Sequence, residues 1–343
     1  THGNLVGFNQ IYNNGGDGVF ITGTGRNDIK NNAVHGNQAN GILVKDISEL
    51  FQQEYAAVIS GNQIGVFFGD EGEVFTNGNG QSGIRISNVQ RMLIGLADIL
   101  FPDPKNIIAA NRGDGIRLEN GTRKVSINNS VIGTTTTGTL NLGNAGDGIL
   151  IIDSPDNTIG AVGTGNIISG NELNGIEINN SPLNGVFGNF IGIIGSGDGY
   201  VKLGNGLNGV NVLNSDSVQI GQAFLSSFLG NYIGGNGGNG IFLQGAGTQN
   251  ATIKSNYIGT DPADRLLGNA MHGVLILDNA QTISVGGQEI KAGNRVAHNE
   301  QSGIALDPSA GNGIVVDPNE IYANGVKGID LRADGMPLLN DPG

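Results

Sequence analysis

The sequence contains no cysteine and no tryptophan, and charged residues make up only 14% of its 343 positions. The lack of cysteine excludes a disulfide framework and a thiolate metal site. Basic residues are scarce too: 17 Lys and Arg face 30 Asp and Glu, for a formal net charge of −13. This balance argues against nucleic acid, which normally meets a basic patch, and against docking on anionic lipid. No apolar run approaches the roughly 18 residues of a membrane-spanning helix, so no membrane insertion is expected.

Glycine and asparagine are present in excess, with 61 glycines and 45 asparagines. Both are poor helix formers, so an ordinary helical protein is excluded. The glycines follow no three-residue period and there are only 9 prolines, which excludes collagen. Hydrophobic residues make up 38% of the chain, whereas disordered chains are poor in them and rich in charge. The composition therefore predicts an all-β protein with many short strands and tight turns.

One short sequence motif recurs along the whole chain: a glycine followed by an apolar, a variable and a second apolar residue. We call this motif the glycine-led phrase. The glycines that open it are Gly18, Gly41, Gly83, Gly115, Gly148, Gly175, Gly209, Gly240, Gly273, Gly303 and Gly328. Successive copies lie 23 to 42 residues apart, and the alternation inside each copy has the period of two of a β-strand. The repeat predicts a β-solenoid of stacked coils, because no single coil could bury its apolar residues alone.

Two further phrases indicate that the coils differ in their loops. Apolar–Gly steps recur every 61 to 65 residues, at Ile94-Gly95, Ile159-Gly160, Ile220-Gly221 and Val285-Gly286. A second set of such steps leads to a Leu-Gly-Asn before the next strand, at Leu142-Gly143-Asn144, Leu203-Gly204-Asn205 and Leu267-Gly268-Asn269. The pattern predicts about 11–12 coils with a long loop on every second one.

Asparagine and glycine tolerate positive φ, so we expect them at the corners between strands. Asn171, Asn174, Asn236, Asn239 and Asn299 fall where such corners are expected. Stacked asparagines can form ladders in which each side-chain amide binds the one on the next coil.

The runs Asn166–Asn171, Asn256–Asp261 and Gly328–Leu331 resemble bacterial right-handed parallel β-helix repeat proteins, which share a pectate-lyase-like solenoid architecture. The resemblance is strongest to repeat regions of large secreted or cell-surface proteins, and it covers nearly the whole chain. It implies the right-handed sense, which periodicity alone does not give, and an extracellular or cell-surface location in a bacterium. Such chains usually continue into further domains. We therefore expect residues 1–343 to be one β-helix domain within a longer chain.

Residues 45–110 depart from the pattern and are expected to carry irregular insertions on the solenoid. Asp46–Ala57 has apolar residues near helical spacing and predicts a short helix, while Met92–Pro104 reads as an irregular stretch. Both are interpreted as loops packed on the coils. A lateral binding site is the alternative.

The middle residue of each glycine-led phrase should point outward, where its side chain could contact a substrate or ligand. This column reads Phe20, Leu43, Arg85, Arg117, Leu150, Glu177, Asn211, Phe242, Leu275, Ala305 and Asp330. Related β-helix enzymes are lyases, hydrolases and epimerases that place acids, bases and cations on such outward positions. Five of these eleven residues are Phe or Leu, so no catalytic groove is expected and no catalytic residue is assigned. The column is typical of a face covered by a loop, a domain or another copy.

One charged patch is a candidate carbohydrate site. It comprises Arg85, Arg112, Asp114, Arg117 and Glu177, with Glu119 beside them in the sequence. Arginines bind the carboxylate of an acidic sugar through paired hydrogen bonds. The alternative is a solvated network in which the acids offset the arginines. The tripeptide Arg112-Gly113-Asp114 matches an integrin-type motif, and we interpret it as a consequence of the corner sequence.

No cofactor is assigned with certainty, and calcium is the candidate that we consider. Solenoid corners expose carbonyl and carboxylate oxygens, the donors that calcium prefers. The acids are densest near the C-terminus, and a site there would use Asp330, Asp334, Asn340 and Asp341. Solvated acids are the alternative. His272 and His298 lie about one coil apart without the close spacing of a helical zinc site, so a turn or surface role is expected.

These observations favour a non-enzymatic, extracellular structural or adhesive rod that contacts polysaccharide or assembles with copies of itself. The alternative is a lyase or epimerase acting on uronate polymers, with Arg85, Arg117, Asp114 and Glu177 as candidates. A third option is a phage tail or depolymerase spike, which requires a trimer.

Overall fold

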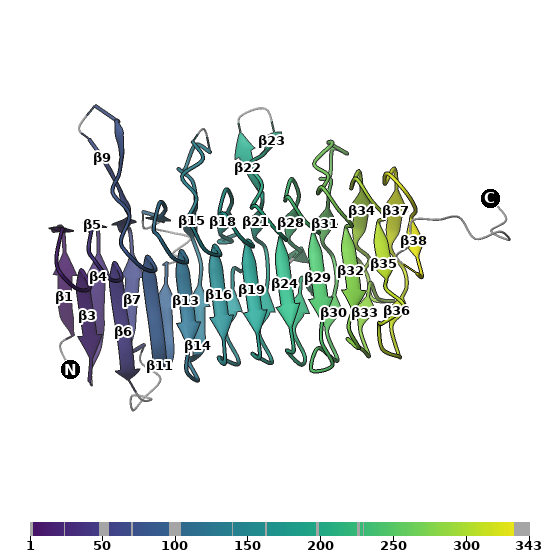
Figure 1. The fold of residues 1–343 in the computed structure, drawn as a ribbon, viewed down its shortest axis with the longest axis horizontal. Helices are drawn as coiled ribbons and strands as arrows, with labels where there is room; N and C mark the ends of the chain where they lie inside the picture. Colours follow the sequence, from purple (N-terminus) through teal and green to yellow (C-terminus); the bar gives the residue numbers. More distant parts are fainter. Residues whose placement is uncertain are drawn as a thin grey trace, which may run out of the picture.

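The computed structural model describes residues 3–332, apart from residues 24, 48–54, 70, 96–103, 139, 162, 197–198, 225–226 and 229. Within these residues it contains strands and no helix, and hence no helix that could cross a membrane. The strands stack into an elongated rod of coils that advance from the N-terminus to the C-terminus (Figure 1). Each coil places one strand in each of three parallel sheets, which we name A, B and C in chain order.

Sheet A begins each coil. Its strands are β1 (Asn4–Gly7), β4 (Asn27–Lys30), β7 (Ala57–Ser60), the second part of β11 (Ile84–Ile94), β14 (Arg123–Ile127), β17 (Thr158–Ile159), β20 (Gly185–Val186), β25 (Gln219–Ile220), β30 (Thr252–Ile253), β33 (Ser284–Val285) and β36 (Val315–Val316).

Sheet B follows and has eleven strands. They are β2 (Gln10–Tyr12), β5 (Ala33–His35), β8 (Gln63–Ile64), β12 (Asn106–Ile108), β15 (Ser130–Ile132), β18 (Ile167–Ile168), β21 (Phe190–Ile191), β28 (Tyr232–Ile233), β31 (Tyr257–Ile258), β34 (Arg295–Ala297) and β37 (Glu320–Tyr322).

Sheet C closes each coil and contains the glycine-led phrases. Its strands are β3 (Val19–Thr22), β6 (Ile42–Ile47), the first part of β11, β13 (Ile116–Glu119), β16 (Ile149–Ile152), β19 (Ile176–Asn179), β24 (Val210–Leu213), β29 (Ile241–Gln244), β32 (Val274–Leu277), β35 (Ile304–Leu306) and β38 (Ile329–Asp330). Because β11 runs through both sheets, A and C form one sheet of 21 strands.

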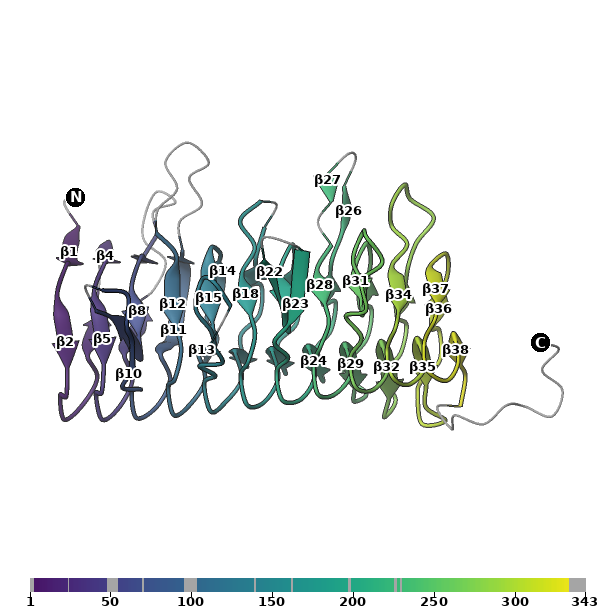
Figure 2. The ribbon, with the colours of Figure 1, turned by 90° about the horizontal axis from the view of Figure 1, so that it is seen from above.

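The chain is therefore a right-handed parallel β-helix, and the winding can be followed in Figures 1 and 2. The eleven strands of sheet B correspond to the eleven glycine-led phrases, so the expected fold class and coil number are confirmed. All pairings between successive coils in the three sheets are parallel, as in β19 against β24 and β21 against β28.

The core consists of columns of β-branched side chains, one from each coil and sheet. On sheet B, Ile168, Ile191, Ile233 and Ile258 occupy successive rungs and are fully buried. Burying each such side chain contributes roughly 1.5–3 kcal/mol relative to leaving it exposed. A lone coil would leave these columns open at both ends, so the stacking itself supplies the burial.

The glycine that opens each sheet C strand is required by close packing between coils. A Cβ atom added at Gly240 would lie 2.7 Å from the carbonyl oxygen of Gly273 and 2.7 Å from Cγ2 of Ile258. Any side chain here would therefore push successive coils apart. This steric requirement explains why the phrase recurs in every coil.

The predicted asparagine ladders are present at the corners. One ladder has an asparagine in every coil, at Asn14, Asn37, Asn79, Asn111, Asn144, Asn171, Asn205, Asn236, Asn269, Asn299 and Asn324. Each residue donates its backbone N–H and its Nδ2 to Oδ1 of the next, as Asn205 does to Asn236 at 3.2 and 2.9 Å. A second ladder at the corner between sheets A and B runs from Asn9 to Asn319 and is interrupted at Ser130.

Between residues 45 and 110 the irregularity is narrower than expected. Strands β7, β8, β11 and β12 of this interval lie in regular register in the sheets, and Met92 is a buried residue of β11. The main departure in the described part is the hairpin of β9 (Val66–Phe68) and β10 (Val74–Thr76). The helix expected at 46–57 depends on residues 48–54, which lie outside the described residues.

Candidate functional site

Long loops flank sheet B on both sides. Odd-numbered coils carry them at the corner between sheets B and C, after β8, β15, β21 and β31. Even-numbered coils carry them at the corner between sheets A and B, after β11, β17, β25 and β33. These positions match the two sets of apolar–Gly steps in the sequence, and Figure 2 looks onto sheet B between the two rows of loops. Two adjoining pockets lie over sheet B between these loops, and we name this hollow the channel.

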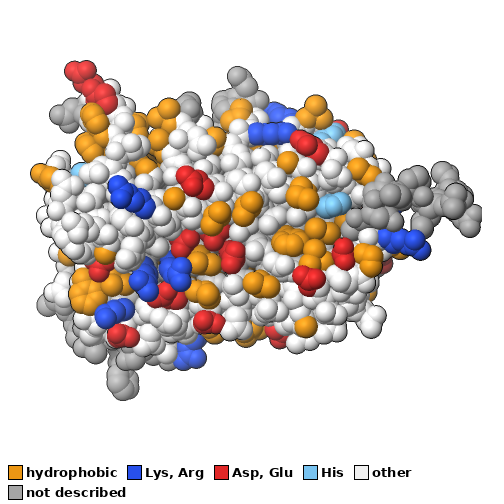
Figure 3. Space-filling view, in the orientation of Figure 1, with side chains coloured by type: hydrophobic (Ala, Val, Ile, Leu, Met, Phe, Trp, Pro, Cys, Tyr) orange, Lys and Arg blue, Asp and Glu red, His pale blue; other side chains and the backbone are white. Residues whose placement is uncertain are grey.

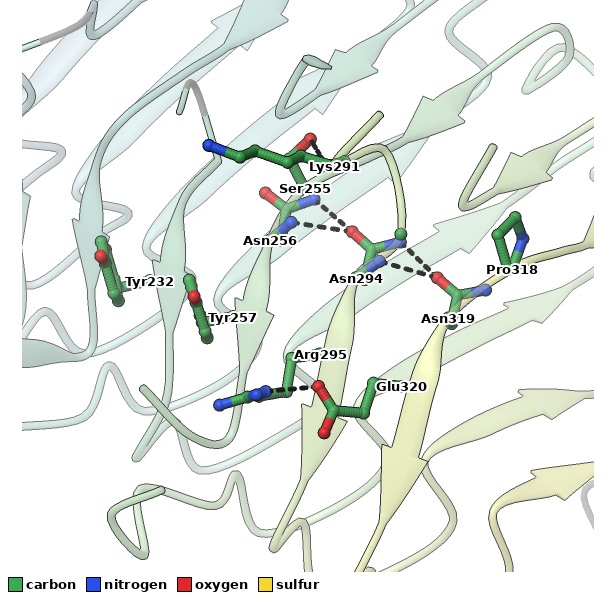
Figure 4. Close-up of a pocket in the computed structure, with 11 residues that line it drawn as sticks. Tyr232, Ser255, Asn256, Tyr257, Lys291, Asn294, Arg295, Pro318, Asn319 and Glu320 are labelled. Carbon is green, nitrogen blue, oxygen red and sulfur yellow. Dashed lines mark hydrogen bonds and ion pairs between the residues drawn. The ribbon is translucent and has the colours of Figure 1, made fainter. Parts of the chain in front are cut away.

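The floor of this channel changes chemistry along its length. Successive outward residues along the two pockets are Ile167, Phe190, Tyr232, Tyr257, Arg295 and Glu320, whereas Ile107 and Val131 on the preceding coils are buried. The channel therefore passes from aliphatic through aromatic to charged side chains. One pocket over this sheet has a volume of about 620 Å³ and surrounds Tyr257, with Lys291, Arg295 and Glu320 also in its lining (Figure 4). A second pocket of about 320 Å³ adjoins it and shares Tyr232 as a lining residue.

The aromatic residues of the floor form a stacked column. Ring centroids are 5.0 Å apart for Phe190 and Tyr232 and 5.1 Å apart for Tyr232 and Tyr257, with interplanar angles of 11° and 5°. These spacings follow the distance of about 4.8 Å between strands. The rings therefore cover each other's faces and turn their edges toward the channel. Tyr200, from the wall, lies 5.4 Å from both Phe190 and Tyr232.

Charged groups close the column at its C-terminal end. The guanidinium of Arg295 lies over the ring of Tyr257, at 5.8 Å from the centroid. Its Nε donates to Oε2 of Glu320 at 2.7 Å, and the Glu320 side chain is 57% exposed. Burial raises the pKa of Tyr232 to about 12, and the neighbouring Tyr200 and Tyr257 add to the shift. Tyr232 is therefore a neutral hydrogen-bonding group at physiological pH.

The wall between sheets B and C is built from two interlocking loops. β22 (Ile193–Ser196) and β23 (Gly199–Lys202) form a hairpin that carries Tyr200. The guanidinium of Arg265 packs against Gly199, where an added Cβ would lie 2.3 Å from its Cζ. Arg265 is held by the fully buried Asp261, which also accepts the backbone N–H groups of Ala263 and Arg265.

This loop also presents Asp264 to two groups on later coils. Oδ1 of Asp264 accepts a hydrogen bond from the Tyr322 hydroxyl at 2.6 Å and contacts Nε2 of His298 at 2.8 Å. These bonds hold the pKa of Asp264 below its usual range, with that from Tyr322 contributing most. The far wall includes the short hairpin of β26 (Ala223–Phe224) and β27 (Ser227–Phe228).

The charged patch predicted from the sequence lies on sheet C, away from this floor (Figure 3). Arg85 and Arg117 are register partners, and both bind Glu119, at 2.6 and 2.7 Å. Arg117 also contacts Asp114 at 3.4 Å, and Arg112 lines a pocket of about 350 Å³ with these residues. Burial alone would raise the pKa of Glu119, but the hydrogen bonds from Arg117 and Arg85 outweigh it and lower that pKa.

The patch is narrower than the predicted set. Leu150 separates Glu177 from Arg117 in the register, and Glu177 instead accepts hydrogen bonds from Asn174 and Asn211. Asp114 is 8% exposed and its Oδ1 accepts the backbone N–H of Asp147, so the Arg-Gly-Asp tripeptide does not present its carboxylate.

Asp147 is a buried carboxyl that the sequence reasoning did not single out. Its pKa is raised to about 7, chiefly by burial, with the nearby charges of Glu177 and Asp114 contributing to the shift. Its Oδ1 accepts the backbone N–H and Nδ2 of Asn174 at 2.8 and 3.0 Å. The residue belongs to a third ladder, in which Asn40, Asn174, Asn208 and Asn239 occupy the equivalent position on other coils.

The calcium prediction falls largely outside the described residues, which end at residue 332 and so omit Asp334, Asn340 and Asp341. Asp330 is buried, binds Lys327 at 3.2 Å and accepts the backbone N–H of Arg332. Among residues 3–332, gaps excepted, no group of three His, Asp or Glu side chains could hold a metal ion. Calcium at the C-terminus remains a prediction.

The channel residues had a signal in the sequence. Asn189-Phe190-Ile191-Gly192, Asn231-Tyr232-Ile233-Gly234 and Asn256-Tyr257-Ile258-Gly259 repeat one phrase of asparagine, aromatic, isoleucine and glycine. Period two places the isoleucine inward and the aromatic outward. Reading outward positions only from the glycine-led phrase of sheet C missed this column.

Comparison with known proteins supports a likeness of fold. The family model of the periplasmic copper-binding protein NosD matches residues 1–96, which precede the pocket around Tyr257. The match covers 96 of the 343 residues, so it does not show that the chain belongs to this family. No curated protein matches the chain in sequence.

Several solved structures resemble the chain at low identity. The A-module of the mannuronan C-5 epimerase AlgE6 of Azotobacter vinelandii is 16% identical, with a TM-score of 0.43, over 92% of this chain and 91% of that one. The Dettilon tailspike protein gp208 is 14% identical, with a TM-score of 0.47, over 92% and 61%. PfbA, a surface adhesin of Streptococcus pneumoniae, is 10% identical, with a TM-score of 0.34, over 95% and 85%. At these identities the likeness concerns the fold alone.

Proposed function

We propose that this β-helix is a non-enzymatic adhesive module of a secreted or cell-surface protein, and that it contacts polysaccharide through the channel over sheet B. The observation that carries the proposal is the continuous groove around Tyr232 and Tyr257, which ends at the Arg295–Glu320 pair. Loops from alternate coils flank the groove on both sides (Figure 2).

The shape of the groove favours a polymer over a small molecule. It runs along the rod, and its floor repeats at the strand spacing of about 4.8 Å. Tyrosine edges, an arginine and the amides of the ladder at its side offer both donors and acceptors. Hydroxyl-rich chains need such mixed hydrogen bonding together with apolar contact surface.

The proposal is tested by mobility of the purified chain in gels containing different polysaccharides. Retardation by at least one polymer is expected, and Tyr257→Ala should abolish it by opening the aromatic column. The matched control is Phe20→Ala, because Phe20 is an exposed aromatic under Lys45 on sheet C, at 5.5 Å. Equal retardation of Tyr257→Ala and the wild type, or no retardation by any polymer, would reject the proposal.

The second candidate function is a lyase or epimerase of uronate polymers on sheet C. The observation that favours it is Asp147, whose pKa of about 7 lies in the range useful for acid–base catalysis. It sits near the Arg117–Asp114 pair, which could face a uronate carboxylate. Ultraviolet absorbance of unsaturated products, or a change in uronate composition, tests this activity. Turnover that Arg117→Ala abolishes would establish it over the adhesive function.

A further inference from the structure

We infer that the occupant of the channel is an anionic polysaccharide, whose acid groups are held between Arg295 and Lys291. This inference rests on the proposed function and names the ligand class for the same groove. Three observations support it: the positive charge of the pocket lining, the Nη atoms of Arg295 that bind no other described residue, and the fact that the arginines of sheet C already bind protein carboxylates.

The pockets of the channel are basic although the protein is acidic. Their lining residues include three basic side chains, Lys105, Lys291 and Arg295, and one acid, Glu320. The whole chain carries a formal charge of −13. A concave site of opposite sign to the rest of the surface attracts an anionic chain and orients it along the groove.

Arg295 retains binding capacity after its internal contacts are made. Its Nε binds Glu320, whereas neither Nη atom hydrogen-bonds to another described residue. Figure 4 shows the guanidinium extending from Glu320 toward the ring of Tyr257, which limits its rotation. A guanidinium fixed in this way offers a planar pair of donors that matches the two oxygens of a carboxylate or a sulfate.

Lys291 faces the same pocket from its other side. Ser255, Asn256, Lys291 and Arg295 all line the pocket, and in Figure 4 Ser255 and Asn256 lie between Lys291 at one edge and Arg295 at the other. Two cations on opposite sides of an aromatic floor can bind acid groups on neighbouring sugar units of one chain.

The arginines of sheet C are already committed to protein carboxylates. Glu119, which binds both Arg85 and Arg117, has a side chain that is only 7% exposed. Glu320 is 57% exposed and binds Arg295 through one nitrogen. Water screens the exposed Arg295–Glu320 pair more strongly than the buried pairs of Glu119. A ligand anion can therefore bind Arg295 beside Glu320 at a lower cost in free energy than displacing Glu119 would require.

The test measures affinity for polygalacturonate, for heparin and for neutral dextran, by calorimetry at low and high salt. Arg295→Gln should weaken binding of at least one acidic polymer by roughly tenfold or more. Glu320→Gln removes the competing acid and should strengthen the same binding. Arg26→Gln is the matched control, because Arg26 forms an exposed ion pair with Asp28 on sheet A, and it should change nothing.

The outcomes separate this inference from the proposed function. Selective, salt-sensitive binding of polygalacturonate supports a carboxylate ligand, and a preference for heparin supports a sulfate. Equal binding of dextran and the acidic polymers, unchanged in Arg295→Gln, overturns the inference and leaves the adhesive function standing. Loss of affinity in both Arg295→Gln and Glu320→Gln would mean that the ion pair only shapes the pocket, and would also overturn it. Absence of binding to every polymer rejects both.

Discussion

Asp147 offers a direct test of how the corner ladders stabilise this fold. In its ladder, four asparagines that precede strand-leading glycines donate Nδ2 to Oδ1 of the residue on the preceding coil, as Asn174 does to Asp147. Asp147 has only its backbone N–H to donate to Asp114, at 3.0 Å, and its ionised carboxylate faces two other acids. Asp147→Asn supplies the missing Nδ2 donor at equal volume and removes the charge.

The expected gain in stability of Asp147→Asn follows from the raised pKa of Asp147. The carboxyl rises from an ordinary value of 3.8 to about 7 on folding, which is a shift of about three units. Each unit corresponds to 1.36 kcal/mol, so the ionised group costs the folded state about 4 kcal/mol at most. Because the folded pKa lies above the unfolded one, the folded state holds more protons between these values. Stability conferred by Asp147 is thus lost as the pH rises from about 4 to about 7.

Urea unfolding of the wild type and of Asp147→Asn, at about pH 4 and about pH 8, measures this effect. At each pH we take the free energy of unfolding of the variant minus that of the wild type. We expect this difference to be about 1–4 kcal/mol larger at the higher pH than at the lower one. Asp153→Asn is the control, because Asp153 is an exposed acid one strand away and its substitution changes the net charge equally. This control accounts for the loss of one negative charge.

The reasoning is refuted if Asp147→Asn differs from the wild type by the same amount at both pH values. It is refuted equally if the variant is less stable than the wild type at about pH 8 while Asp153→Asn is unchanged. Either result would mean that the carboxylate is stabilised in the fold by interactions that outweigh its burial and its acidic neighbours.

Three further predictions address the packing and the wall of the channel. Asn236→Ala should lower the free energy of unfolding by about 2–4 kcal/mol, because it leaves buried ladder partners unpaired, and urea unfolding measures the loss. Gly240→Ala should destabilise more than Gly15→Ala, since an added Cβ meets backbone at 2.7 Å in the first case and nothing within 4 Å in the second, so their thermal midpoints should differ. Tyr322→Phe should raise the pKa of Asp264 toward its ordinary value, and equal carboxyl titrations by NMR in both proteins would contradict this.

Much of the architecture was predictable because it repeats. The glycine-led phrase places one sheet C strand in each coil, and the added-Cβ contacts at Gly240 explain why that glycine cannot vary. The apolar–Gly steps likewise marked the positions of the long loops, although not that they alternate between the two sides of sheet B. Repetition turns a weak local signal into a strong one, since each coil reports the same environment.

The candidate site was less predictable for two reasons. Arg85, Arg117 and Asp114 were correctly expected to lie together, but their commitment to Glu119 depends on side-chain geometry between coils. The stacking of Tyr232 on Tyr257 needed the register of sheet B, which follows a different phrase.

By itself, the sequence determined that the chain is all-β, that it repeats, and which residues line its core and corners. These properties depend on period-two alternation and on steric demands within one coil or between neighbours. Only the tertiary structure decided which face is concave, which arginine keeps donors for a ligand, and that Asp147 is buried beside other acids. Those properties depend on which loops and charges of different coils meet in space, and no single repeat encodes that.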